Sequence, residues 1–201
     1  MYTFHNSQLH FMVVERYEQV NLIGREFAAP KSQKLATADH SRYKFSAAAY
    51  EMREVYITGG FVNGRESKSV LRFSISDDTF VPVADLNLPI NYHGSTIAGD
   101  NLYVIGFVIE VLDLSAENAI WQFVNSDNYS GRTRPCVVAL STKQVLIMGG
   151  YEVNSCTSEF FMLETGKGEV RKVKGAPFKF QAIDGNNQTL LERTGVVLSY
   201  V

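Results

Sequence analysis

The chain has 201 residues and a formal net charge of −2, and 45% of its residues are hydrophobic. This length and apolar content suffice for one domain with a substantial core, and an aromatic content of 12% argues against a disordered chain. The 19 basic and 21 acidic residues form no long run of one sign, which excludes the electrostatic footprint of a nucleic-acid-binding protein. We therefore expect no nucleic-acid partner.

The start of the chain, MYTFHNSQLHFMVV, lacks the basic opening and apolar block of a signal peptide. No window contains the roughly 18 uncharged apolar residues that a membrane helix needs. Cys136 and Cys156 are too few for a disulfide framework and form no CxxC pair. We expect a cytoplasmic protein without membrane contact, in which both cysteines are free thiols.

The first elements in chain order are two apolar strands within residues 9–23, LHFMVV and EQVNLI, in which Val13 and Val20 have six residues between them. They predict half of a four-stranded unit. The stretch at 24–40, GREFAAPKSQKLATADH, has no strand pattern and is expected to be a long excursion or a docking segment.

Three full units are predicted next, at about 42–89, 90–127 and 129–175. Each has a first strand (SAAAY, HGSTIAG or CVVALS), a turn, and a second apolar strand that ends at glycine: EVYITGG, NLYVIGF or QVLIMGG. Gly59 and Gly106 are 47 residues apart, and Gly106 and Gly149 are 43 apart. Such periods are typical of propeller blades and of helical pairs, and the short β-branched and aromatic segments exclude the helical pairs.

Third and fourth strands are predicted after each glycine, around two bulky residues with six residues between them. These pairs are Phe73 and Phe80, Leu114 and Trp121, and Leu163 and Val170. The first strands are rich in small side chains, such as Ala47, Ala48, Ala49, Gly94 and Ser95, which suit a position crowded around a central axis. The pattern predicts an all-β propeller of four-stranded antiparallel blades with the first strand innermost.

The units resemble kelch repeats, whose motif is four apolar residues, a double glycine and an aromatic pair. The first unit matches best, with VYIT, Gly59 and Gly60, Phe73 and Phe80, and Arg42 at the arginine position of the family. Phe107 and Leu114 depart from the motif in the second unit, as Leu163 and Val170 do in the third. The resemblance covers about residues 9–200 and implies a kelch-type β-propeller. Kelch proteins often act as ubiquitin-ligase adaptors or cytoskeletal binders, and the latter role implies association with the cytoskeleton.

Residues 178–201 contain FKFQAID and QTLLERTG, which match a first and a second strand, so a half unit is expected at each end of the repeat. Pairing of the two halves would give a fourth, composite blade and a small closed ring of about four blades. The alternative is a partial propeller, an open arc completed by another chain or by a missing part of a longer polypeptide. A contact between residues 10–14 and 188–195 distinguishes the two arrangements.

Binding residues are expected on one face of this propeller. In a four-strand meander, the connections between second and third strands lie on the same face as the links between blades. Aromatic and arginine residues on the loops of a rigid scaffold are typical of binding hot spots. The sequence predicts such residues at Phe61, Arg65, Tyr92, His93, Tyr129, Arg132, Arg134 and Tyr151.

Catalytic motifs are missing from the sequence. The four histidines lie on separate segments without metal-ligand spacing, and there is no nucleophile elbow, phosphate loop or dinucleotide motif. No cofactor, metal or catalytic residue is therefore expected. The first hypothesis is a non-catalytic scaffold for protein–protein interaction, as a subunit of a larger assembly. The alternative is a small-molecule enzyme, such as a sugar epimerase with a pocket at the central channel. A third is a structural fragment whose sheet edges a neighbour completes.

Overall fold

The computed structural model of the protein describes residues 42–51, 53–152 and 155–174, together with the backbone of four short strands between residues 2 and 11 and between 189 and 198. Every regular element among these residues is a β-strand, as the sequence predicts. None of them forms a helix that could cross a membrane.

Three four-stranded antiparallel sheets, here called blades 1 to 3, form the body of the molecule. Blade 1 contains, in order of pairing, β4 (Ser46–Tyr50), β5 (Glu54–Thr58), β8 (Val70–Ser74) and β9 (Thr79–Val83). Blade 2 contains β10 (Gly94–Ala98), β11 (Asn101–Ile105), β12 (Ile109–Asp113) and β13 (Gln122–Phe123). Blade 3 contains β14 (Cys136–Ser141), β15 (Gln144–Met148), β18 (Phe160–Glu164) and β19 (Glu169–Lys172).

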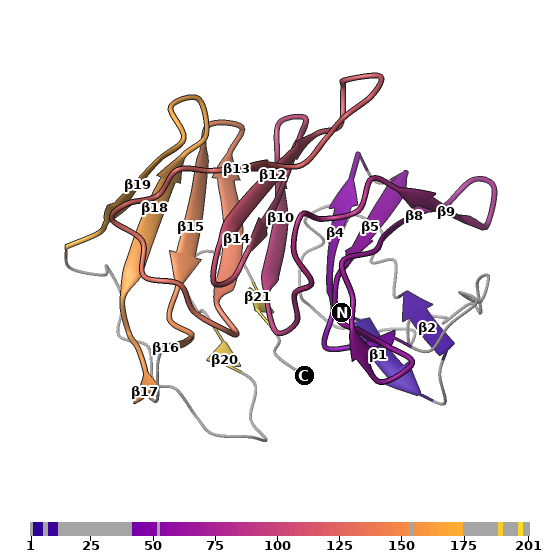
Figure 1. Ribbon diagram of the computed structural model, residues 1–201, viewed down its shortest axis with the longest axis horizontal. Coiled ribbons are helices and arrows are strands. Elements are labelled where there is room, and N and C mark those ends of the chain that lie inside the picture. Colours follow the sequence, from indigo (N-terminus) through magenta and orange to yellow (C-terminus); the bar gives the residue numbers. More distant parts are fainter. Residues whose placement is uncertain are drawn as a thin grey trace, which may run out of the picture.

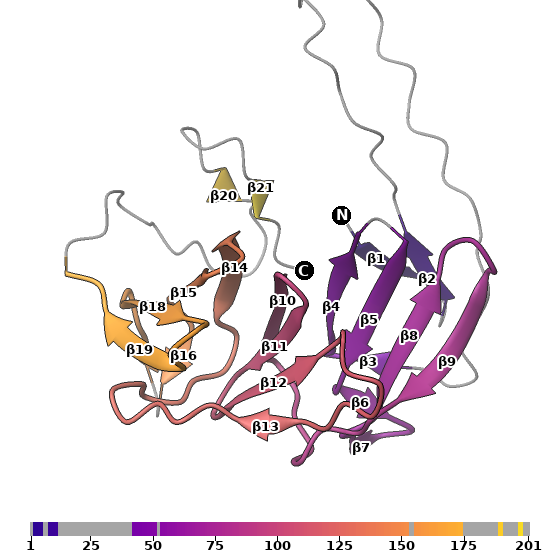
Figure 2. The ribbon, with the colours of Figure 1, turned by 90° about the horizontal axis from the view of Figure 1, so that it is seen from above.

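The blades stand side by side as a fan, with their first strands β4, β10 and β14 nearest to one another (Figures 1 and 2). Small and hydroxylated side chains permit this approach. Ser95 Oγ donates to Ser46 Oγ at 2.8 Å, and a Cβ added to Gly94 would collide with the side chain of Val137. The prediction that the first strand of each unit is innermost is confirmed.

The two interfaces between blades use the same positions of the repeat. Blade 2 turns a face made by Leu102, Val104, Leu112 and Trp121 towards blade 1, and blade 3 turns Val145, Ile147, Leu163 and Val170 towards blade 2. These side chains are all buried, and burying one of them is worth roughly 2 kcal/mol. Burial of these equivalent side chains therefore stabilises the packing of each blade against the preceding one.

The bulky pair predicted in each unit faces across the third and fourth strands in blades 1 and 3. Phe73 is opposite Phe80, with ring centroids 4.7 Å apart, and Leu163 is opposite Val170. In blade 2 the prediction of Leu114 is wrong. Leu112, which is opposite Leu102 as Phe73 is opposite Val55, holds the equivalent position, and the register of β12 and β13 places it against Trp121.

A deletion explains this error. The connection between second and third strands has eleven residues in blades 1 and 3 (59–69 and 149–159) but only three, 106–108, in blade 2. The connection from β12 to β13 is longer instead, so the unit keeps nearly the same length. A second correction concerns the first strand predicted as HGSTIAG, which begins at Gly94 and not at His93: Gly94 is opposite Ile105, as Ser46 is opposite Thr58.

The described strands form no closed ring. β1 (Tyr2–His5) pairs with β2 (Gln8–Phe11), and β20 (Thr189–Leu190) pairs with β21 (Val197–Leu198). The composite blade predicted from the two half units, for which residues 10–14 would contact residues 188–195, is thus not formed by these strands. The rest of both predicted half blades, 12–23 and most of 178–201, and the stretch at 24–40 lie outside the described residues.

Candidate functional site

The links between blades run over the same face of the molecule as the connections between second and third strands, as expected for a meander. Gly60 N donates to Ile90 O at 2.7 Å, and Arg132 N donates to Gly106 O at 3.1 Å. We call this surface the loop face. It is formed, among the described residues, by segments 42–45, 59–69, 84–93, 106–108, 124–135 and 149–159 with its gap at 153–154.

Three equivalent residues of the loop face share an uncommon backbone conformation. Lys44, Tyr92 and Arg134 each lie two residues before an innermost strand, and their φ angles are 56°, 49° and 55°. Their backbones are joined in sequence, since Tyr92 N donates to Lys44 O at 3.1 Å and Arg134 N donates to Tyr92 O at 2.5 Å. A left-handed conformation costs a side-chain-bearing residue roughly 1–2 kcal/mol. Such strain, repeated and held by the fold, is typical of functional sites.

The side chains at these positions converge on one tyrosine ring. Lys44 Nζ lies 4.6 Å and Arg134 Cζ lies 4.3 Å from the ring centroid of Tyr92. Lys44 Nζ is also 5.0 Å from the ring of Phe61, which stacks on Tyr43 at 5.0 Å and 12°. We call these five residues the axial cluster because four of them precede the innermost strands on the loop face and the fifth, Phe61, pairs with Tyr43.

The axial cluster combines exposed cations with aromatic surface. Lys44, Arg134 and Tyr43 are exposed, and Phe61 and Tyr92 are half-buried. Neither Lys44 nor Arg134 takes part in the ion pairs that the described residues form. Lys44 and then Arg134, beside the phenol, lower the pKa of Tyr92. The cluster is therefore a positively charged aromatic patch.

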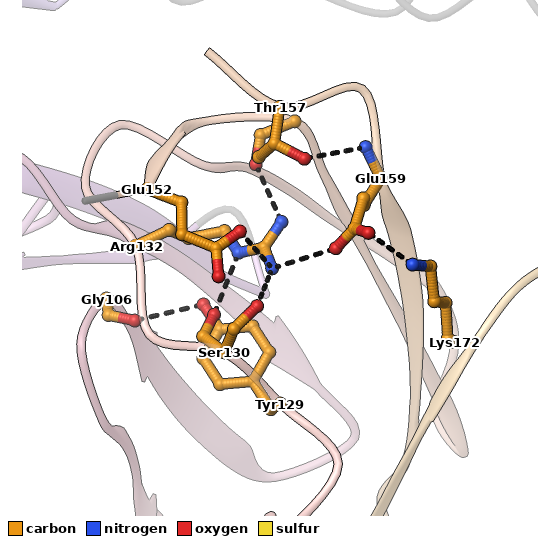
Figure 3. A network of polar contacts seen from close by, with 9 residues as sticks. Gly106, Tyr129, Ser130, Arg132, Glu152, Thr157, Glu159 and Lys172 are labelled. Atoms are coloured by element: carbon orange, nitrogen blue, oxygen red, sulfur yellow. Dashed lines mark hydrogen bonds and ion pairs between the residues drawn. The ribbon is translucent and has the colours of Figure 1, made fainter. Parts of the chain in front are cut away.

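A second aromatic and guanidinium assembly lies between blades 2 and 3 (Figure 3). The side chain of Arg132 is 0% exposed and donates to Ser130 O at 3.0 Å, to Ser130 Oγ at 2.7 Å and to Gly149 O at 3.2 Å. Its Nη2 also lies 3.7 Å from a carboxylate oxygen of Glu159 and 4.0 Å from one of Glu152. The buried charge is thus both hydrogen-bonded and paired.

Rings cover the guanidinium of Arg132. Its Cζ lies 4.5 Å from the ring of Phe161 and 5.2 Å from that of Tyr129, whose hydroxyl donates to Gly106 O at 2.9 Å. Burial raises the pKa of Tyr129, and Lys172, followed by Arg132, lowers the pKa of Glu159 (Figure 3). We call Tyr129, Arg132, Glu152, Glu159 and Phe161 the interblade anchor.

Arg132 is the structural counterpart of Arg42. Arg42 Nη1 donates to Gly59 O at 2.5 Å, as Arg132 donates to Gly149 O, and in both cases the arginine precedes its glycine by seventeen residues. The prediction of Arg132 as a surface binding residue is therefore corrected: its guanidinium supports the fold from beneath the surface. The shared spacing to the glycine is the signal that could have identified this role.

The other predicted binding residues separate into three groups. Phe61, Tyr92 and Arg134 belong to the axial cluster. Tyr129 belongs to the interblade anchor. Arg65 on β7 (Arg65–Glu66) and Tyr151 on β16 (Tyr151–Glu152) are exposed and belong to neither group.

His93 is buried, with Nε2 2.8 Å from Thr58 Oγ1, so it cannot contact a partner at the surface. Burial, helped by the charge of Arg42, lowers its pKa to about 3. We therefore correct its assignment as a binding residue.

Tyr43 and Lys44 were not predicted as binding residues. Lys44 precedes Gly59 by the same interval that separates Arg134 from Gly149. Aligning the repeats on their lead-in segments, the residues just before each innermost strand, would therefore have found it.

In the described part of the chain, no three histidine, cysteine, aspartate or glutamate side chains are grouped so that they could hold a metal ion. Both cysteines are free, and burial raises the pKa of Cys136 to about 11.

Comparison of the chain with protein-family models and with curated proteins returned no match.

Proposed function

We propose that the protein is a non-catalytic protein-interaction module, a subunit of a larger assembly, that binds its partner through the axial cluster of a kelch-like propeller. The observation that carries this proposal is the gathering of Lys44, Arg134 and three aromatic rings at one exposed place. Tyrosine and arginine are over-represented among residues that dominate binding energy, and loops on a rigid scaffold are where such residues act.

The backbone beneath the cluster favours binding. Lys44, Tyr92 and Arg134 are held by hydrogen bonds between neighbouring lead-in segments, and each of these segments continues directly into an innermost strand. A surface that is ordered before binding loses less conformational entropy when the partner arrives. The axial cluster is thus better suited to recognition than an equal number of aromatic residues on unsupported loops.

Affinity capture followed by quantitative mass spectrometry tests the proposal. The K44A/Y92A/R134A variant removes the exposed cations and the central ring. The control, R53A/K143A/K167A, removes three exposed cations from turns at the opposite ends of the strands, at 51–53, 142–143 and 165–168. We expect the cluster variant to lose partners that the control and the unmodified chain retain, with similar thermal unfolding of all three.

Retention of every partner by the cluster variant would contradict the axial cluster as the binding surface. This experiment leaves out Tyr129, because its half-buried ring and its hydrogen bond to Gly106 O belong to the scaffold, so its removal would confuse binding with stability.

A further inference from the structure

We infer that the axial cluster recognises an acidic peptide segment, in which carboxylates contact Lys44 and Arg134 and a neighbouring apolar side chain packs on the rings of Tyr43 and Phe61. This inference rests on the proposed function, because it specifies the chemistry of the partner at the same site.

The charge distribution of the loop face is the first step. Its acidic residues are largely engaged: Glu152 and Glu159 pair with Arg132, and Asp85 pairs with Lys68. Glu66 accepts a hydrogen bond from Asn91 at 2.5 Å, and Asp127 is the remaining carboxylate of the described loop-face segments. The exposed cations Lys44, Arg65 and Arg134 form no ion pair within the described residues. On the described loop face of this chain of net negative charge, unpaired positive charge therefore gathers where Lys44 and Arg134 flank one ring.

The geometry around Tyr92 is the second step. Lys44 and Arg134 both lie within 5 Å of the same ring, so two positive charges are held close together without a neutralising carboxylate. A carboxylate placed beside them would relieve their mutual repulsion and gain attraction from both. The guanidinium of Arg134 offers the planar fork that binds carboxylates through two parallel hydrogen bonds.

The extent of the positive charge favours a peptide over a nucleic acid. A nucleic-acid strand is followed by a continuous row of cations along its phosphates. Here the exposed, unpaired cations of the described loop face are only Lys44, Arg65 and Arg134, and the loop between β15 and β18 contributes the carboxylates of Glu152 and Glu159 to the same face. An acidic peptide needs only a local pair of cations. The stacked rings of Tyr43, which is 44% exposed, and Phe61 provide apolar surface for a side chain next to the acidic one.

Selection from a random peptide library displayed on phage, with the purified full chain immobilised, tests the inference. We compare the unmodified chain, the K44E/R134E variant, the Y92A variant and the control R53E/K143E, which reverses two exposed charges at the opposite ends of the strands. Selected peptides are synthesised with a fluorescent label, and their dissociation constants are measured by anisotropy at low and high salt.

The expected result is an excess of aspartate and glutamate in peptides selected by the unmodified chain and by R53E/K143E. K44E/R134E should bind those peptides at least about tenfold more weakly, since two attractions become repulsions. Their affinity for the unmodified chain should fall with added salt.

Two other outcomes separate failure of the inference from failure of the proposed function. Peptides that lose binding to Y92A but show no acidic excess would overturn the acidic partner and leave the binding surface intact. Peptides that bind every variant equally, or a library from which nothing is enriched, would count against the surface itself. A labelled single-stranded oligonucleotide that binds the unmodified chain more tightly than the selected peptides, and loses binding to K44E/R134E, would overturn the choice of peptide.

Discussion

The axial cluster and the interblade anchor both contain an arginine and aromatic rings but differ in the exposure of that arginine. Each contains a guanidinium against a tyrosine ring, and Arg132 and Arg134 are only two residues apart in the chain. Arg132 is enclosed, hydrogen-bonded and paired with carboxylates, whereas Arg134 is exposed and lies outside the ion pairs of the described residues. Satisfied charges hold blades together, and the charges left unsatisfied at the surface are those available to a partner.

Backbone conformation causes this division. Side chains two residues apart in an extended strand point to the same side. The left-handed φ of 55° at Arg134 breaks the extended conformation two residues after Arg132, and φ is 56° at Lys44, two residues after the buried Arg42. The same left-handed residue in both segments therefore places one cation, Arg42 or Arg132, in the interior and the other, Lys44 or Arg134, at the surface.

The strongest test compares R132A with R134A. R132A leaves the carboxylate of Glu152 without a cation and the carbonyl of Gly149 without the guanidinium, while Glu159 keeps only Lys172, so we expect a loss of about 3 kcal/mol in the free energy of unfolding. R134A should change it by less than about 0.5 kcal/mol. Urea unfolding followed by tryptophan fluorescence measures both. Equal stability of the two variants would show that Arg132 does not anchor the blades.

Among glycine substitutions, the larger loss of stability is expected at Gly59 and the smaller one at Gly149, beside the interblade anchor. Gly59, whose carbonyl accepts from Arg42, and Gly149, whose carbonyl accepts from Arg132, both have φ of +56°. A Cβ at Gly59 would lie 2.5 Å from Ile90 O, whereas one at Gly149 would lie 3.2 Å from Thr157 O.

Both alanine variants carry the backbone strain of roughly 1–2 kcal/mol, and G59A adds a clash that brings its cost to about 3 kcal/mol. Chemical denaturation of the pair should therefore show G59A as the less stable. The opposite order would mean that the link at 84–93, which carries Ile90, moves away from the added methyl group at little cost in free energy.

As the pH falls, protonation should lower the free energy of unfolding through His93 before it does so through Glu159 of the interblade anchor. His93 has a pKa of about 3 in the folded chain and about 6.5 when unfolded, so between these values only the unfolded chain binds the proton. The free energy of unfolding then falls as the pH falls below about 6.5, by up to roughly 1.4 kcal/mol per pH unit and about 2 kcal/mol by pH 5. The lowered pKa of Glu159 affects the free energy of unfolding only at lower pH: its contribution is lost as the pH falls below the unfolded pKa of about 4.3.

The H93Q variant should lack this part of the pH dependence. Unfolding by urea at about pH 7 and about pH 5 compares its slope with that of the unmodified chain. Identical slopes would assign the acid sensitivity to other groups.

The smallest effect is expected from removal of single hydroxyls. Y129F removes one of the two donors to the carbonyl of Gly106, which keeps Arg132 N, and should cost about 1 kcal/mol. Y92F keeps the ring that Lys44 and Arg134 contact and should leave the unfolding midpoint unchanged. Thermal unfolding distinguishes the two, and a larger loss for Y92F would mean that its hydroxyl holds the lead-in segments together.

Local patterns made the blades predictable from the sequence. Apolar strands that end at Gly59, Gly106 and Gly149 specify strand type, order and the crowded inner position, and these need no knowledge of distant contacts. The register in blade 2 was not predictable by counting, because a shortened connection at 106–108 and a lengthened one before β13 nearly cancel. The error at Leu114 follows from that cancellation.

The site was less predictable because exposure depends on backbone conformation. Phe61, Tyr92 and Arg134 were found by residue type on the correct face, but residue type gave the same weight to Arg132 and His93, which are buried. Lys44 was missed since a lysine on a loop is common. The kelch resemblance, the epimerase alternative and completion of the propeller by another chain stay predictions.

The short connection at 106–108 also decides how the link between blades 2 and 3 crosses the loop face. Loops of eleven residues rise over blades 1 and 3, while blade 2 between them carries only three, with Phe107 64% exposed. The link at 124–135 lies against the short connection, since Arg132 N donates to Gly106 O at 3.1 Å and a Cβ added to Gly131 would collide with Phe107 O. A connection of eleven residues on the middle blade would therefore have to displace this link and, with it, the arginine that it carries between blades 2 and 3.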